Sequence, residues 1–349
     1  MQLNFETFER YLFMNVFDLS EQEIVRRNSL NELRNMGIDP YPAAEYEVTA
    51  HTTEIKRDFS DDSAEQWHVR IAGRVMSRRI MGKASFMELQ DSCGRIQVYV
   101  SRVDICPVET KDTYNVVFKK LLDIGDFVGV EGFVFRTQMG EITVHAEKLT
   151  VLSKSLRPLP IVKVKDGVTY DAFEDPELRY RQRYVDLVVN DGVKDVFMQR
   201  ATVIRTIRKV LDEAGYTEVE TPTLQSIAGG ASARPFLTHF NALDIPMYMR
   251  IATELYLKRL IVGGFEGVYE IGKNFRNEGM DRNHNPEFTC LELYVQYKDY
   301  NWMMSFTEKL LEQVCIAVNG TTEREIDGKM VSFKTPYHRL PILDAIQEK

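Results

Sequence analysis

Cysteine is scarce in this sequence, and long apolar runs are missing. Cys93, Cys106, Cys290 and Cys315 show no Cys-x-x-Cys spacing and no zinc-ligand order with the histidines. A disulfide framework and a structural zinc site therefore have no support, and a reducing cytoplasm is the expected location. No run of about 18 apolar residues exists, which excludes a transmembrane helix. Charged residues close to the N-terminus also argue against a secretory signal peptide.

Glycine and proline are not enriched, which excludes collagen-like and low-complexity classes. The net charge of -8 argues against non-specific coating of DNA, so no DNA partner is expected. One basic stripe nevertheless stands out, because no acid lies between its first and last members: Arg70, Arg74, Arg78, Arg79 and Lys83. A local patch of this kind is compatible with RNA binding. The length of 349 residues allows two domains.

The first regular element is a helix predicted over residues 19–36. Ser20 and Glu23 have the spacing of a capping box, and Gly37 is a stop signal. One face carries apolar residues, namely Ile24, Leu30, Leu33 and Met36, whereas the other carries Arg26, Arg27, Glu32 and Arg34. The pattern favours a solvated amphipathic helix, with a basic-faced helix that touches RNA as the alternative.

A series of short strands follows this helix. Alternating apolar residues predict strands at 69–75, 86–89, 94–100, 127–135 and 141–149, with a helix at 114–124. Five strands with a helix between the third and fourth have the element order of an OB-fold barrel. The proline-containing stretch 155–162 then predicts a linker and a domain boundary.

The second half of the chain mixes helices and strands. A strongly amphipathic helix is predicted at 195–214 and ends at Gly215. Further helices are expected at 254–261 and 302–318, and strands at 216–221, 247–251, 267–271 and 288–297. This order favours an α+β domain with an antiparallel sheet.

The segment 269–294 concentrates the residues that carry chemistry. It is predicted to form a strand, a polar loop and a second strand. Arg276 at the end of the first strand is suited to clamp a phosphate, and Phe288 can stack on a base. Glu292 and Tyr294 lie two residues apart on one face of the sheet, where they would suit an ammonium group. The alternative is a surface hairpin with its charges in solution.

Several segments together resemble class II lysyl-tRNA synthetases of the bacterial type. The resemblance covers nearly the whole chain from residue 18. Its general class II elements are Gly-Tyr-Thr-Glu-Val-Glu-Thr-Pro (215–222), similar to motif 1, and Phe-Arg-Asn-Glu (275–278) with His-Asn-Pro-Glu-Phe (284–288), similar to motif 2. Its lysine-specific elements are Gly-Gly-Ala-Ser-Ala-Arg-Pro-Phe (229–236) and the helix after Arg250. Two N-terminal segments, 34–42 and 78–86, are also similar to the family.

The resemblance implies a function and a set of site residues. The family activates lysine with ATP and magnesium, and transfers it to the 3′ end of tRNA(Lys). Arg276 would be the catalytic residue at the α-phosphate, and the ATP site would consist of Arg276, Glu278, His284 and Phe288. The lysine site would consist of Gly230, Glu254, Glu292 and Tyr294, and the anticodon site of Arg78, Arg79, Phe86 and Gln97. A homodimer would form through residues 196–222.

The predicted organisation is multidomain, with an N-terminal OB-fold barrel before an incomplete class II catalytic domain. Residues 1–13 match nothing in the family, 14–65 form a helical segment, 66–154 the barrel, 155–175 the linker and 176–349 the catalytic domain. Either Met1 or Met14 could be the start.

Three features of the family are not found in this sequence: motif 3, the magnesium ligands and the main carboxylate for the lysine ε-ammonium group. The resemblance implies that they lie beyond Lys349, the last residue of the sequence. A C-terminally truncated chain, with no metal ligands of its own, is therefore expected.

Other functions remain open at this stage. A chain without motif 3 could be a non-catalytic remnant that keeps tRNA or dimer contacts. Aspartyl- or asparaginyl-tRNA synthetase and the ligase that adds lysine to a translation factor are further alternatives. The last of these lacks the barrel, and the segment 229–236 favours lysine over aspartate.

Overall fold

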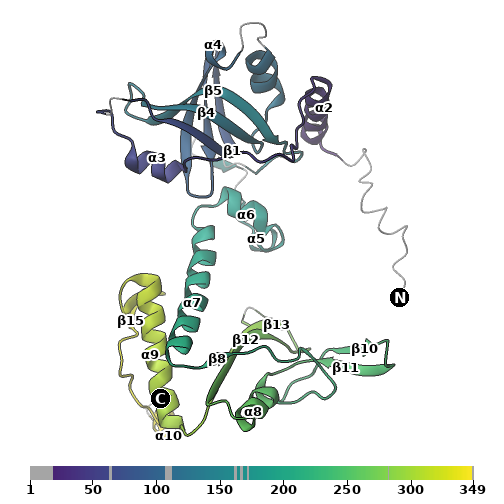
Figure 1. The fold of residues 1–349 in the computed structure, drawn as a ribbon, viewed down its shortest axis with the longest axis vertical. Coiled ribbons are helices and arrows are strands. Elements are labelled where there is room, and N and C mark those ends of the chain that lie inside the picture. The colour runs from purple at the N-terminus through teal and green to yellow at the C-terminus, as the bar shows by residue number, and fades with distance from the viewer. Residues whose placement is uncertain are drawn as a thin grey trace. The chain divides into compact units, whose positions relative to one another are not determined.

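The computed structural model describes residues 19–62, 65–106, 112–160, 173–281 and 283–347, together with the backbone of Lys163–Lys165 and Val168–Tyr170. The unmatched residues 1–13, the possible start at Met14 and the last residue, Lys349, lie outside this part. The described chain divides into two compact units, and the division falls after Asn190 (Figure 1). Within the described residues, no helix has both the length and the apolar character needed to cross a bilayer.

The first unit is built on a closed barrel of five strands, as the sequence predicts (Figure 1). The strands are β1 (His68–Met81), β2 (Ala84–Gln90), β3 (Arg95–Ser101), β4 (Phe127–Arg136) and β5 (Ile142–Ser153). They follow the order β1-β2-β3-β5-β4 around the ring, and β3 and β5 are the parallel pair. Helix α4 (Arg102–Ile105) and the π-helix η2 (Thr113–Leu121) lie between β3 and β4. This is the OB-fold order, which confirms the predicted barrel.

Alternation along the strands explains why this sequence closes into a barrel. In β2 and β3 every second residue is buried, so Leu89, Ile96 and Val98 point into one core. Tyr114 and Phe118 of η2 are fully buried against the same core. The predicted helix at 114–124 therefore closes the barrel with its apolar face.

Helix α2 (Glu21–Asn35) confirms the predicted capping box at Ser20 and Glu23 but corrects the predicted faces. Leu30 and Leu33 are buried as expected. Ile24 is instead 41% exposed, whereas Arg26 is only 5% exposed. The expectation for these two residues was wrong because the barrel presents backbone carbonyl groups to this helix, and a guanidinium can satisfy them where an alkyl chain cannot.

Short elements of the first unit lie before and after the barrel in the sequence. They are α3 (Thr52–Asp58) before the barrel, and the hairpin β6 (Lys163–Lys165) and β7 (Val168–Tyr170) after it. Helices α5 (Pro176–Arg181) and α6 (Arg183–Val189) follow the hairpin. The buried carboxylate of Asp186 in α6 binds Arg179 and Arg183, which stabilises the turn between the two helices.

The second unit begins with helix α7 (Val193–Glu213), which ends before Gly215 with φ of 82°, as predicted. Strand β12 (Gly267–Phe275) pairs with β13 (Glu287–Val295) in an antiparallel hairpin, and the short β8 (Thr217–Glu218) joins β12 in parallel. A second sheet has the order β10 (Leu237–Phe240), β11 (Ile245–Met249) and β9 (Leu224–Gln225). The remaining elements are α8 (Glu254–Val262), α9 (Tyr300–Asn319), β14 (Glu323–Ile326), β15 (Lys329–Ser332) and α10 (Ile342–Gln347).

Candidate functional site

The hairpin of β12 and β13 places Phe288, Glu292 and Tyr294 of the predicted catalytic-domain site on one face of a sheet. The directly paired residues are Asn274 and Phe288, Gly272 and Cys290, Glu270 and Glu292, and Val268 and Tyr294. Because side chains alternate along a strand, the side chains of Phe288, Cys290, Glu292 and Tyr294 share one face. Cys290 was missed by the sequence analysis, although this same alternation could have identified it.

Arg276 and Phe288 form the end of the site that was predicted to hold ATP. The backbone N–H of Arg276 donates to the carbonyl of Pro286 at 2.9 Å, which closes the hairpin loop. The guanidinium carbon lies 5.1 Å from the centre of the Phe288 ring. Arg276 Nε is buried and has no partner among the described residues. An arginine with an unused buried donor beside an aromatic face can bind a phosphate next to a stacked base.

Glu278 links the loop after Arg276 to the segment 229–236. Its Oε1 accepts the backbone N–H of Arg234 at 3.2 Å, and the N–H of Asn277 donates to the Arg234 carbonyl at 2.8 Å. The segment 229–236 is therefore attached to the loop that follows Arg276. This attachment brings Glu278 of the predicted ATP site into direct contact with the segment that contains Gly230 of the predicted lysine site.

His284 lies on an exposed turn that Asp281 organises. Its Nδ1 is 2.8 Å from Asp281 Oδ2, and Asp281 Oδ1 accepts the N–H groups of Asn283 and His284 at 2.7 and 2.8 Å. These hydrogen bonds, that from the Asn283 N–H first, lower the pKa of Asp281 below its ordinary value. Arg282, in the same loop, lies outside the described residues. Within the described chain, His284 forms no hydrogen bond or ion pair with Arg276 and no ring contact with Phe288.

The four residues predicted to bind lysine come from three elements: Glu292 and Tyr294 from the hairpin face, Glu254 from the start of α8 and Gly230 from a loop. Gly230 has φ of 86°, and a Cβ there would come within 3.1 Å of the Glu254 Cβ. Glu292 accepts the N–H of Thr253 at 3.3 Å and the hydroxyl of Tyr294 at 3.2 Å. Burial, followed by the charges of Glu292 and Glu254, raises the pKa of Tyr294. Glu254 and Glu292 therefore place negative charge beside the partly desolvated Tyr294.

A buried ion pair on this same face, next to Glu292, was not anticipated. Arg250 and Glu270 are each 4% exposed at the side chain and bind one another directly. Arg250 Nε also donates to the Lys273 carbonyl at 2.8 Å, and Glu270 accepts the Thr221 hydroxyl at 2.6 Å. The pair ties β12 to Thr221. Neither Arg250 nor Glu270 stands out in the sequence, because each looks like an ordinary surface charge there.

Unsatisfied buried atoms mark the same region. Thr253 Oγ1, Asn274 Oδ1 and Arg276 Nε are buried and have no hydrogen-bond partner among the described residues. Buried polar atoms are nearly always paired with protein or water, so three such atoms around one sheet face indicate a place for a polar ligand.

The barrel contains a separate hollow of about 470 Å³ that brings together three predicted anticodon residues. Arg79, Phe86 and Gln97 all line it, and the Arg79 guanidinium carbon lies 6.0 Å from the centre of the Phe86 ring. Further lining residues that the sequence did not predict are Lys56, Arg95, Met139 and Glu141. An aromatic ring, cations and an amide in one hollow can bind an unstacked base.

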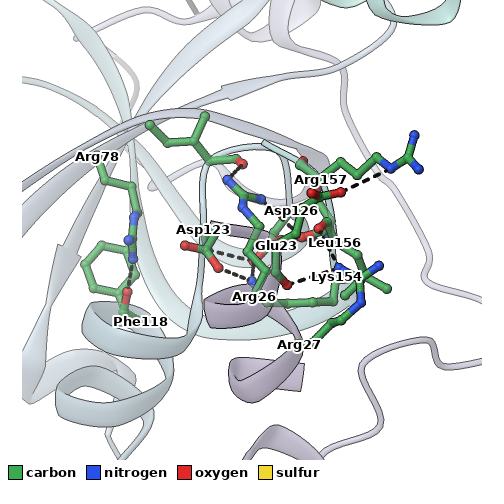
Figure 2. A network of polar contacts seen from close by, with 12 residues as sticks. Glu23, Arg26, Arg27, Arg78, Phe118, Asp123, Asp126, Lys154, Leu156 and Arg157 are labelled. Atoms are coloured by element: carbon green, nitrogen blue, oxygen red, sulfur yellow. Dashed lines mark hydrogen bonds and ion pairs between the residues drawn. The ribbon is translucent and has the colours of Figure 1, made fainter. Parts of the chain in front are cut away.

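Arg78 does not join this hollow, which corrects the expected position of its side chain. Arg78 Nη1 donates to the backbone carbonyl of Phe118 in η2 (Figure 2). Because consecutive residues of β1 point to opposite sides, Arg78 and Arg79 could not both face the same base. Arg78 therefore attaches β1 to the helix that closes the barrel.

No metal site is evident in the described part of the chain. There, no group of three or more His, Cys, Asp or Glu side chains is placed to hold one cation. The described residues do not fit the magnesium that the resemblance implies, and no step of the chemistry is assigned to it. The expectation that the family's magnesium ligands lie beyond Lys349 stays a prediction, because Lys349 itself is outside the described residues.

Comparison with known proteins agrees with both units. Residues 175–349 match the family described as tRNA synthetases class II (D, K and N), and residues 69–152 match the OB-fold nucleic acid binding domain. Among curated relatives, the chain is 65% identical over 336 residues to a lysine–tRNA ligase of Porphyromonas gingivalis. It is 60% identical over 331 residues to one of Christiangramia forsetii.

Both alignments cover nearly the whole chain, 96% and 95%, but only 58% of each relative, so the chain spans less than two thirds of their length. A lysine–tRNA ligase of Azobacteroides pseudotrichonymphae is 64% identical over 330 residues, which are 95% of the chain and 66% of that relative. Half of the chain matches the synthetase family, and that half contains the hairpin site. The chain therefore belongs to the class II tRNA synthetases of the D, K and N group.

Proposed function

We propose that this protein is a lysine–tRNA ligase that activates L-lysine with ATP and transfers it to tRNA(Lys). The observation that carries the proposal is the Glu292 carboxylate. It accepts hydrogen bonds from Thr253 and Tyr294, and no cation forms an ion pair with it among the described residues. A carboxylate in this state can pair with the ammonium group of lysine. The carboxylate of aspartate would be repelled there, and the amide of asparagine would leave the charge unpaired.

The activation step follows from the arrangement along the hairpin. The lysine carboxylate oxygen attacks the α-phosphorus, the bond from that phosphorus to the bridging oxygen breaks, and pyrophosphate leaves. Arg276 stabilises the charge on the α-phosphate and Phe288 stacks on the adenine. Positioning and charge stabilisation, without a general base, are sufficient for this chemistry. The family implies magnesium, which would neutralise charge on the phosphates when bound.

The remaining site residues take supporting roles in the proposal. Glu254 binds the α-amino group of lysine, and Gly230 gives the backbone close access to it. Glu278 and His284 border the nucleotide, and Tyr294 orients Glu292. Glu254 is paired with Lys258 at 2.5 Å, so lysine would compete with this i,i+4 pair for the carboxylate.

The barrel would read the anticodon of tRNA(Lys), with Phe86 stacking on a base while Arg79 and Gln97 contact base edges or phosphate. We assign Arg78 a structural role within that site. A homodimer through residues 196–222 also belongs to the proposal, and it is supported by the exposure of Val196, Phe197 and Met198 at 64%, 47% and 55%. A cytoplasmic location agrees with the four free cysteines described by the structure.

The test is ATP–pyrophosphate exchange by the protein purified from its source cells at its native length. Exchange that requires lysine and is absent with aspartate or asparagine supports the proposal. Exchange with either of the other amino acids would overturn the choice of substrate. Binding of tRNA(Lys) without any exchange would instead favour a non-catalytic tRNA-binding remnant.

A further inference from the structure

Four consecutive residues at the end of the barrel are each held by a side chain from the N-terminal segment. We name residues 154–157 the exit segment, because the chain leaves β5 through them. The Lys154 carbonyl accepts the Tyr41 hydroxyl at 2.8 Å, the Ser155 carbonyl accepts Arg26 Nη1 at 3.1 Å and the Leu156 carbonyl accepts Arg27 Nη1 at 3.4 Å. Arg157 pairs with Glu23 at 3.4 Å (Figure 2).

Arg26 is the centre of this arrangement. It is 5% exposed, and its second terminal nitrogen donates to the Ile124 carbonyl at 2.9 Å. One guanidinium therefore joins α2 to the loop before β4 and to the exit segment. The contacts to Ser155 and Ile124 span 129 and 98 positions of sequence. They form only when α2 is seated on the barrel.

The barrel side of the exit segment is fixed by a buried ion cluster. The Lys154 side chain is fully buried and its Nζ lies 2.5 Å from Asp123 and 2.8 Å from Asp126. Asp126 also accepts the backbone N–H of Ser155 at 2.7 Å. Figure 2 shows Lys154, Asp123 and Asp126 beside Arg26. The exit segment is thus held between the barrel on one side and α2 on the other.

An irregular backbone needs partners of this kind. Residues 154–157 follow the last strand pairing of β5, so their carbonyl groups have no ladder to join. Water could satisfy them equally well and would leave the chain free to turn. Donors from α2 and Tyr41 instead select one path for the backbone out of the barrel.

We propose that α2 and the segment after it clamp the exit segment, where the chain leaves the barrel toward the second unit, with Arg26, Arg27 and Tyr41 as the positioning residues. The clamp restricts the directions in which the linker leaves the barrel. A tRNA that contacts both the barrel and the second unit would then have less linker freedom to restrict on binding than it would with an unclamped exit segment. The tRNA part of this inference rests on the proposed function, whereas the clamp itself rests on the contacts alone.

The test compares Arg26→Met with Arg34→Met in the full chain. Both variants remove one guanidinium from α2, but Arg34 is exposed and no described contact ties it to the exit segment. Two quantities are measured for each: hydrogen exchange at the amides of Lys154 and Ser155, and the dissociation constants of an anticodon stem-loop RNA and of whole tRNA(Lys). The milder variants Arg27→Gln and Tyr41→Phe provide the same comparison if Arg26→Met does not fold.

With Arg26→Met, exchange at these amides should rise on the order of tenfold because the exit segment opens locally. Binding of the stem-loop should stay unchanged, whereas whole tRNA should bind about fivefold to tenfold more weakly. Arg34→Met should change none of these values. Unchanged exchange, or equal weakening for both RNAs, would overturn the clamp. If the unsubstituted chain binds neither RNA, the proposed function fails, and the exchange result still decides for or against the clamp.

Discussion

Glu270 and Glu292 lie directly opposite each other on β12 and β13, yet their carboxylates have different partners. Glu270 is neutralised by the buried guanidinium of Arg250. Glu292 receives only the N–H of Thr253 and the hydroxyl of Tyr294 in the described chain. Like charges directly opposite in a sheet are unfavourable, so one carboxylate is paired inside the protein and the other is left for a ligand.

Replacing Glu292 with Gln should therefore weaken lysine binding. The substitution keeps the shape and one acceptor oxygen but removes the charge that would pair with the ammonium group. A hydrogen bond to a charged partner contributes about 2 kcal/mol, so the dissociation constant of lysine should rise roughly thirtyfold. Calorimetric titration of lysine into the protein measures this dissociation constant.

The matched control for that experiment is Glu270→Gln. Loss of this charge leaves Arg250 buried without its counterion, which should destabilise the fold by about 3–5 kcal/mol. Lysine binding by the fraction that remains folded should be nearly unchanged. The lysine assignment would be wrong if Glu292→Gln bound lysine as tightly as the parent protein does.

A second prediction uses the neighbouring pair Arg78 and Arg79. Arg79→Met should weaken binding of an anticodon stem-loop RNA by about 1–3 kcal/mol, because it removes a cation beside the stacking ring of Phe86. It should leave stability unchanged, since the side chain is exposed. Arg78→Met should instead lower the stability of the barrel and leave RNA affinity unchanged, because the Phe118 carbonyl loses its donor.

Filter binding of the RNA and a urea melt of each variant separate the two effects. Equal loss of RNA affinity in both variants would contradict the assignment of Arg78 to the fold and Arg79 to the hollow.

Gly230 provides a third prediction. Its φ of 86° is unfavourable for a residue with a Cβ, and that atom would press to 3.1 Å on both Ala252 and Glu254. Gly230→Ala should therefore displace Glu254 and lower lysine affinity at least about tenfold, with a cost in stability of about 1–2 kcal/mol. Gly264→Ala is the control, because its φ is also positive at 106° but its Cβ would meet open space. Equal lysine affinity in the two variants would contradict the role of Gly230.

The sequence predicts the barrel well for a simple physical reason. Residues such as Val98 and Leu89 alternate with polar neighbours, and the period of two is independent of the rest of the chain. Most of the hairpin site follows from the same period, because Glu292 and Tyr294 must share a face. The prediction of a strand at 216–221 was less successful, since β8 covers only Thr217–Glu218.

The predictions from sequence that were wrong concern arginines that bind backbone carbonyl groups. In the sequence, Arg26 looks like a solvent-exposed charge and Arg78 like an RNA-binding residue, but each binds a distant backbone carbonyl. Such a partner is set by tertiary structure, and hydrophobic periodicity carries no information about it. The same reason explains why the Arg250–Glu270 pair was not found.

The fourth prediction concerns acid and the turn between β2 and β3. Asp91, 9% exposed at the side chain, accepts the N–H and hydroxyl of Thr52 at 2.8 Å each and the N–H groups of Cys93 and Gly94 at 2.7 and 2.8 Å. Burial acts to raise the pKa of Asp91, but these hydrogen bonds outweigh it and lower the pKa below the ordinary value. A lowered pKa means that the stabilisation is complete above about pH 4 and is lost as the pH falls through the native value.

Asp91→Asn should remove this dependence, because an amide cannot ionise and supplies one acceptor oxygen where the carboxylate supplies two. At pH 7 the variant should be less stable by about 1–3 kcal/mol. Between pH 5 and pH 3 the parent should lose more stability than the variant, so the difference between them should shrink. Urea unfolding followed by the fluorescence of Trp67 in a Trp302→Phe background isolates the barrel, since the chain has only these two tryptophans. A constant difference between parent and variant across that range would show that Asp91 ionises in the folded barrel as it does in the unfolded chain.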